Sequence, residues 1–186
     1  MRFSQTTKCF YPEWGNYAEL PDDIVTIPDE DFEAVANKGA HDSVIVENGR
    51  VVIVPEGNDS KLQRAKAAKA QAIEEAFQAA EAMPVSVNGW QFKGGFTSGL
   101  AIDAQRRAAE MYRQLNPQAP DTATFFDVHG TPVTVPLLSD TEVDAADICL
   151  SISYIVSLNT FKYEQLRNAV WAATTVEEVA AISWGE

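Results

Sequence analysis

The amino-acid sequence predicts an α+β fold, and three stretches of the chain lead to this prediction. Residues 43–54 contain two β-branched runs around Asn48-Gly49, a dipeptide that favours the two-residue turn of a β-hairpin. Residues 60–83 are rich in alanine and contain no glycine or proline, which is typical of a long helix. Apolar residues recur every three or four positions over 149–170, which predicts a second long helix with one buried face. The chain thus combines local hairpins with long helices, as in α+β proteins.

Length and charge limit the classes of function. The chain has 186 residues, of which 46% are hydrophobic, so it can bury a core as one domain or two small ones. Its formal net charge of −13 argues against binding to nucleic acid or to an anionic membrane. No apolar stretch approaches the length needed to cross a bilayer. The acidity indicates either a solvated surface or an acidic docking face, and the first is favoured.

The two cysteines, Cys9 and Cys149, are far apart in the sequence and do not suggest a disulfide framework. Cys149 lies in an apolar run, where a free thiol behaves as a small hydrophobic group. Polar residues follow Met1-Arg2, so no signal-peptide core is expected. We therefore expect a soluble protein of the cytosol.

The N-terminal domain is expected over residues 1–58, as a small β-rich unit with one short helix. Aromatic residues alternate with turn-forming residues over 1–28, which indicates short strands and loops. A helix should follow Pro28, with Asp29 as its cap, and should end near Gly39. Its apolar stripe would consist of Phe32, Val35 and Ala36.

A helical connector is expected over residues 59–84. Asp59 or Ser60 can cap this helix and Pro84 can end it. The apolar face is thin, because alanines separate its larger members Leu62, Ile73, Phe77 and Met83. Such a face buries little, so we expect the helix to join two units. Self-association through a coiled coil is the weaker alternative, because two lysines interrupt the seam.

The C-terminal domain is expected over residues 85–186, with short strands packed on two or three helices. Residues 85–92 predict a strand in which Asn88-Gly89 forms a turn or a bulge. Ser98 can cap a helix that runs to about residue 115. The inward face of this helix would consist of Ala101, Ala104, Ala108, Met111 and Leu115. Its opposite face would carry two ion pairs, Asp103 with Arg107 and Arg106 with Glu110.

A second hairpin is expected from residues 122–127 and 131–136, around His129-Gly130. Residues 139–142 have the pattern of a capping box, which would start the long C-terminal helix. The inward face of that helix would consist of Cys149, Ile152, Val156, Asn159, Tyr163, Leu166 and Val170, widened by Ile148 and Ile155. A second capping box at 175–178 would start a short final helix, with Val179 and Ile182 turned inward.

Motifs of enzyme chemistry are missing from the sequence. The only histidines are His41 and His129, and no cysteine or histidine spacing resembles a zinc site. The chain has neither the G-x-S-x-G motif of hydrolases nor a Walker loop. Glycines around Ser98 could cradle an anion at a helix N-terminus, but a plain strand-to-helix turn is favoured. We therefore expect no enzyme, no cofactor and no metal; an unrecognised site would need a deep polar pocket at one of the histidines.

Several segments resemble proteins of bacteriophage tails. Residues 88–92, 125–127 and 172–182 are similar to a recurrent C-terminal domain of phage tail proteins. Residues 11–13 and 27–32 resemble the N-terminal part of tail-fibre assembly chaperones. The resemblance implies an accessory protein that binds the C-terminal region of a phage tail-fibre protein and helps the fibre to fold and trimerise in the host cytoplasm. The alternative is a permanent structural component of the tail or fibre tip, retained on the virion.

Three aromatic residues are the candidate partner-binding residues: Tyr11, Trp14 and Tyr17. Aromatic side chains dominate contact energy in protein interfaces, so these rings could anchor a fibre segment. The competing interpretation is that they fill the small core of residues 1–58. Self-association into a homo-oligomer also stays open, because Asn159 could set the register of paired helices. A hydrogen bond from Asn159 to a backbone carbonyl in an ordinary core is the favoured alternative.

Overall fold

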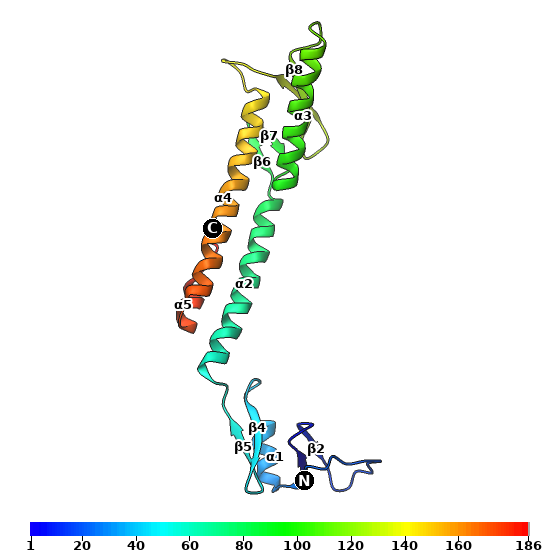
Figure 1. Ribbon diagram of the computed structural model, residues 1–186, viewed down its shortest axis with the longest axis vertical. Coiled ribbons are helices and arrows are strands. Elements are labelled where there is room, and N and C mark those ends of the chain that lie inside the picture. Colours follow the sequence, from blue (N-terminus) through cyan, green and yellow to red (C-terminus); the bar gives the residue numbers. More distant parts are fainter. Residues whose placement is uncertain (186) are drawn as a thin grey trace. The chain divides into compact units, whose positions relative to one another are not determined.

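The computed structural model describes residues 1–185 and has the expected mixture of helices and small antiparallel sheets (Figure 1). The chain divides into two compact units, Met1–Gln63 and Arg64–Glu186, called unit 1 and unit 2 below. The division falls inside a long helix, α2 (Asn58–Ala82), so most of this helix belongs to unit 2.

Unit 1 contains five short strands and one helix. Three strands form an antiparallel sheet in the order β2-β1-β3: β1 (Arg2–Ser4), β2 (Cys9–Tyr11) and β3 (Ile24–Thr26). Helix α1 (Asp29–Ala36) leads to a hairpin of β4 (Ser43–Glu47) and β5 (Arg50–Val54). The small core consists of Phe3, Ile27 and Val44, with Met1, Phe10, Val35, Val46 and Val51 packed against it.

The hairpin of unit 1 confirms the strongest local prediction. Glu47 pairs with Arg50, so only Asn48 and Gly49 form the turn. Their φ angles are 52° and 75°, the left-handed values that a type I′ turn requires at both positions. The Asn-Gly dipeptide therefore sets the register of both strands.

The ends of α1 differ from the prediction. Pro28 is the N-cap and makes no side-chain cap bond, so Asp29 is the first helical residue rather than the cap. The helix ends at Asn37, whose side chain donates to the Glu33 carbonyl at 2.9 Å. Gly39 lies beyond the end, where its N–H donates to the Asp42 carboxylate. Local side-chain hydrogen bonds, one donated by Asn37 and one accepted by Asp42, thus replace the glycine end that the sequence suggested.

Unit 2 contains the rest of α2, two hairpins and three further helices. The hairpins are β6 (Val85–Val87) with β7 (Trp90–Phe92), and β8 (Thr122–Phe126) with β9 (Pro132–Pro136). The helices are α3 (Phe96–Leu115), α4 (Ala145–Ala172) and α5 (Val176–Ala181). The core lies between the hairpins, α3 and the first half of α4, and includes Phe92, Ile102, Phe125, Val135, Ile148 and Ile152. Asn88 and Gly89 form a turn, not a bulge, since Val87 pairs with Trp90.

Helix α4 contacts both α2 and α3 in unit 2. Its C-terminal half runs antiparallel to α2, where Lys66 donates to the Trp171 carbonyl at 2.9 Å and Phe77 stacks on Tyr163. Its N-terminal half runs beside α3, where a Cβ on Gly99 would touch Ile152 at an ordinary 3.5 Å. The two shorter helices therefore follow each other along α4 (Figure 1). Of the α2 face that looked too thin to bury, Ile73 is buried and Phe77 stacks on Tyr163 of α4, whereas Met83 is 66% exposed.

Helix α4 begins later than predicted, but its inward face is confirmed. The N-cap is Asp144, which forms a capping box with Asp147. Ser139 instead accepts hydrogen bonds from the N–H groups of Thr141 and Glu142 in the preceding turn. All seven residues of the predicted inward face are buried or half-buried. Ile148 widens that face as expected, whereas Ile155 is exposed. The box at Thr175 and Glu178 starts α5 as predicted.

Helix α3 presents the opposite face from the one predicted. Ile102 is its buried residue, whereas all five residues of the predicted inward face are exposed. The half-buried side instead carries Asp103, Arg106 and Glu110. Arg106 bonds both carboxylates, at 3.0 Å to Asp103 and more closely to Glu110. Paired charges can line the packed side because each has its partner within the helix.

Candidate protein-binding surfaces

Two of the three predicted aromatic residues, Tyr11 and Tyr17, are in contact with each other. The Tyr11 and Tyr17 rings meet edge to face, with centroids 5.2 Å apart. The Tyr11 hydroxyl lies 3.1 Å from that of Thr7, and the Arg2 guanidinium lies 6.0 Å from the centre of the Tyr17 ring. Neither tyrosine belongs to the core cluster of unit 1. Both rings are half-buried, so they lie at the edge of unit 1 without belonging to its buried core.

Trp14 is the most exposed aromatic side chain of the three. It is 89% exposed, on the loop between Tyr11 and Tyr17. The loop is held at its base, since Gly15 N–H and the Arg2 side chain both donate to the Pro12 carbonyl. The Trp14 ring thus projects from a loop that hydrogen bonds hold at Pro12.

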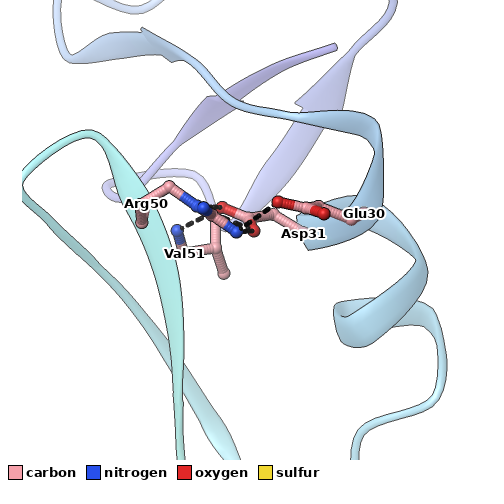
Figure 2. Close-up of polar contacts among 4 residues, drawn as sticks. All are labelled: Glu30, Asp31, Arg50 and Val51. Carbon is pink, nitrogen blue, oxygen red and sulfur yellow. Dashed lines mark hydrogen bonds and ion pairs between the residues drawn. The ribbon is translucent and has the colours of Figure 1, made fainter.

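The acidic start of α1 has a structural role that sequence reasoning missed. Asp31 is buried and accepts from the Arg50 side chain and from the Val51 N–H at 2.8 Å (Figure 2). Arg50 also reaches Glu30 at 2.7 Å. The hydrogen bonds from Arg50 and Val51 hold the pKa of Asp31 below its ordinary value. Asp31 therefore joins α1 to the β4–β5 hairpin, whereas Phe32, which the sequence placed on the apolar stripe of this helix, is 37% exposed.

A second carboxylate joins strands β1 and β3. Asp23 accepts from the Ser4 hydroxyl and from the Thr6 N–H, each at 2.6 Å. These bonds favour the charged form and lower the pKa of Asp23 to about 2. Ser4 is fully buried, and its hydrogen bond to Asp23 holds the end of β1 beside the start of β3.

Unit 2 exposes a row of apolar residues on α4. Leu150, Tyr154, Leu158 and Phe161 form this row, which we call the outer face of α4, and Phe161 is 70% exposed. No charged residue occurs from 148 to 161. A groove of about 190 Å³ runs beside it, lined by Phe96 and Leu100 of α3 and by Ser157 of α4. The signal for this face was present in the sequence, since α4 has more apolar residues than one inward stripe needs.

The glycine loop before α3 does not form an open anion cradle. The Phe96 N–H donates to the Glu81 carboxylate at 2.9 Å, so a carboxylate of α2 occupies the helix N-terminus. The other oxygen of Glu81 accepts from Asn159 at 3.4 Å. The favoured backbone-carbonyl partner of Asn159 is therefore replaced by a side chain. Ser98 is the third residue of α3 rather than its cap, and Gly95 is the N-cap.

The groups considered for enzyme chemistry belong to different units: His41 to unit 1, and His129 and Cys149 to unit 2. His41 and His129 are both exposed. The His129 N–H and the Thr131 N–H donate to Asp127, which lowers the pKa of that carboxyl within the turn. Burial raises the pKa of the Cys149 thiol. Within residues 1–185, no cluster of histidine, cysteine and acidic side chains could hold a metal ion.

Within the described part of the chain, none of the helices has the length and apolar character needed to span a membrane. Comparison of the chain with protein-family models, curated proteins and solved structures found no match in any of the three.

Proposed function

We propose that this protein is a phage tail-fibre assembly chaperone. It would bind the C-terminal region of the fibre protein in the host cytoplasm and assist its folding and trimerisation. It would act by protein binding, without catalysis and without a cofactor. The resemblance of residues 11–13, 27–32 and 172–182 to phage tail proteins supports this proposal. The exposure of Trp14 on a fixed loop is the observation that carries it.

The proposed contact is the aromatic group of Tyr11, Trp14 and Tyr17. A fibre tip exposes apolar surface and unpaired strand edges until its three chains interlock, and such surfaces aggregate. A tryptophan ring can cover apolar surface at low entropic cost, because it has few rotatable bonds. The two tyrosines would hold the loop so that Trp14 meets the fibre in one orientation.

The test is co-expression with the neighbouring fibre gene. The wild-type protein should convert insoluble fibre into soluble trimer, measured by fractionation and size-exclusion chromatography. Trp14→Ala should remove most of this effect, because a central tryptophan contributes at least about 2 kcal/mol, roughly thirtyfold in affinity. Leu138→Ala is the matched control, since Leu138 is an exposed apolar residue of unit 2.

The outcomes separate the function from the contact. If the wild-type protein leaves the fibre insoluble, the chaperone function is wrong. If the wild type rescues the fibre and Trp14→Ala rescues it equally, only the assignment of the contact is wrong. Mass spectrometry of purified virions addresses the alternative of a permanent tail component, because a chaperone that is released should be absent from the particle.

A further inference from the structure

The exposed ring of Trp14 lies on a loop that is acidic on both sides of it. This loop spans residues 12–23, between the end of β2 and the start of β3. It contains no lysine or arginine, and four of its residues are acidic: Glu13, Glu19, Asp22 and Asp23. Asp23 is bound within the fold, whereas the other three carboxylates are exposed to solvent. The Trp14 ring therefore projects among free carboxylates.

The start of α1 adds carboxylates beside this loop. The Met1 nitrogen lies 3.4 Å from the Glu13 carboxylate and 3.6 Å from that of Asp29, so these two side chains share one corner of unit 1. Glu30 is also exposed there, although it reaches Arg50. From residue 9 to residue 37 the chain has eight acidic residues and no basic one. The acidity around Trp14 is thus a property of the whole N-terminal surface of unit 1.

The basic side chains of this part of the chain are engaged elsewhere. Lys8 donates to the Val44 carbonyl at 2.9 Å, and Arg50 binds Asp31. Within residues 1–185, neither Glu19 nor Asp22 pairs with a cationic side chain. These carboxylates are therefore available to a partner.

An exposed indole ring beside unpaired carboxylates fits a cationic partner. The face of a tryptophan ring attracts an ammonium or guanidinium group more strongly than the other aromatic rings do. A neighbouring ring already has such a contact, since the Arg2 guanidinium lies 6.0 Å from the centre of the Tyr17 ring. An acidic segment would be repelled, and an uncharged apolar one would leave the carboxylates without partners. Charge thus selects a basic segment as the occupant.

We propose that the Trp14 loop binds a basic segment of the fibre protein. One lysine or arginine of that segment lies over the Trp14 ring, and further basic residues pair with Glu13 and Glu19. The inference rests on the proposed function for the place of contact and adds the chemistry of the segment that is bound. The net charge of −13 attracts such a segment from a distance, so salt should weaken the association.

Binding of labelled synthetic peptides to the full chain, measured by fluorescence anisotropy, tests the proposal. Three peptides of equal length and equal valine content carry lysine and arginine, serine, or glutamate at their other positions. The basic peptide should bind most tightly. Trp14→Leu should weaken its binding at least roughly fivefold, because leucine is apolar but has no ring face to attract a cation. Trp171→Leu is the matched control, since Trp171 is also exposed but belongs to unit 2.

A second pair of variants tests the carboxylates. Glu13→Gln combined with Glu19→Gln should weaken binding of the basic peptide roughly tenfold and reduce its dependence on salt. Glu142→Gln combined with Glu177→Gln removes the same charge from exposed positions of unit 2. This control should bind the basic peptide nearly as tightly as the wild-type protein.

Three results would overturn the proposal. The first is a basic peptide that does not bind, or binds no more tightly than the serine peptide. The second is wild-type affinity in Trp14→Leu. The third is equal weakening by the two double variants, which would indicate general attraction to an acidic protein. Circular dichroism checks that each variant is folded, and Trp14→Gln replaces Trp14→Leu if that protein is not.

The fibre and peptide experiments fail independently. Fibre rescue by a protein that does not bind the basic peptide would overturn only the chemistry of the bound segment. Peptide binding through Trp14 by a protein that leaves the fibre insoluble would overturn only the chaperone function.

Discussion

Two aspartates of unit 1 form hydrogen bonds that connect elements distant in the sequence. Asp31 joins α1 to the β4–β5 hairpin, and Asp23 joins β3 to the end of β1. Each accepts hydrogen bonds from a side chain and from a backbone N–H, which favours its charged form. In a unit whose core has few residues, such contacts define the relative positions of the strands and the helix.

The free energy of unfolding of unit 1 should therefore decrease at low pH, as Asp23 becomes protonated. The folded-state pKa of Asp23 is about 2, below its ordinary value of 3.8. Its stabilising contribution is fully present above pH 3.8 and is lost as the pH falls from 3.8 to about 2. In Asp23→Asn this part of the pH dependence should disappear.

Urea unfolding at a series of pH values measures the effect. The control is Asp22→Asn, at the adjacent exposed position, which should keep the wild-type pH dependence. An Asp23→Asn protein with the same loss of stability between pH 3.8 and 2 would contradict the assignment.

At the scale of elements, the sequence predicted where α3 lies but not which side it buries. The alanine and methionine stripe is the more hydrophobic side by composition. The packed side instead uses Ile102 and the alkyl portions of residues whose charges are paired, above all Arg106. The helical period is the same for both faces, so the contacts with other elements decide which face is buried.

Substitutions on the two faces of α3 should have unequal effects. Ile102→Ala should destabilise unit 2 by about 2–4 kcal/mol, because it leaves a cavity beside a packed core. Met111→Ala should change the free energy of unfolding by less than about 0.5 kcal/mol, since Met111 is exposed. Chemical denaturation measures both, and a reversed order would restore the face predicted from the sequence.

The segment between α2 and α3 requires a glycine at position 94. A Cβ at Gly94 would overlap the Met83 carbonyl oxygen, which is backbone and cannot move aside easily. Gly94→Ala should therefore destabilise unit 2 by about 1–3 kcal/mol. Gly57→Ala provides the control, because open space surrounds that position. Thermal unfolding compares the two variants. Equal unfolding midpoints would show that the backbone around Met83 shifts to accommodate the added methyl group.

For the whole molecule, the local patterns were predictable and the long-range pairings were not. The Asn48-Gly49 turn, the box at Thr175 and the inward stripe of α4 each depend on neighbours within a few positions. The packing of α2 on α4 joins residues about a hundred positions apart, such as Lys66 and Trp171. Because α2 is rich in alanine, this packing produces only a weak hydrophobic periodicity in its sequence. Of the candidate site, sequence reasoning found Trp14 but missed the outer face of α4.

The division into two units predicts two separable unfolding transitions. Phe3 is buried in the core of unit 1, and Phe125 is buried in that of unit 2. Each substitution by alanine should destabilise its own unit by about 3–5 kcal/mol and leave the other transition in place. Hydrogen exchange monitored by mass spectrometry distinguishes the units. Loss of protection in both units after either substitution would mean that they unfold as one.

The dependence of α2 and α3 on α4 has a consequence for the order of folding. The chain emerges from the ribosome N-terminus first, so unit 1 can form from nearby contacts while α4 has not yet been made. Phe77 then lacks its stacking partner until Tyr163 has been synthesised. Closing so long a loop is slow, and the waiting helices are vulnerable to aggregation and proteolysis. Synthesis of α4 is thus the step that commits unit 2 to its native state.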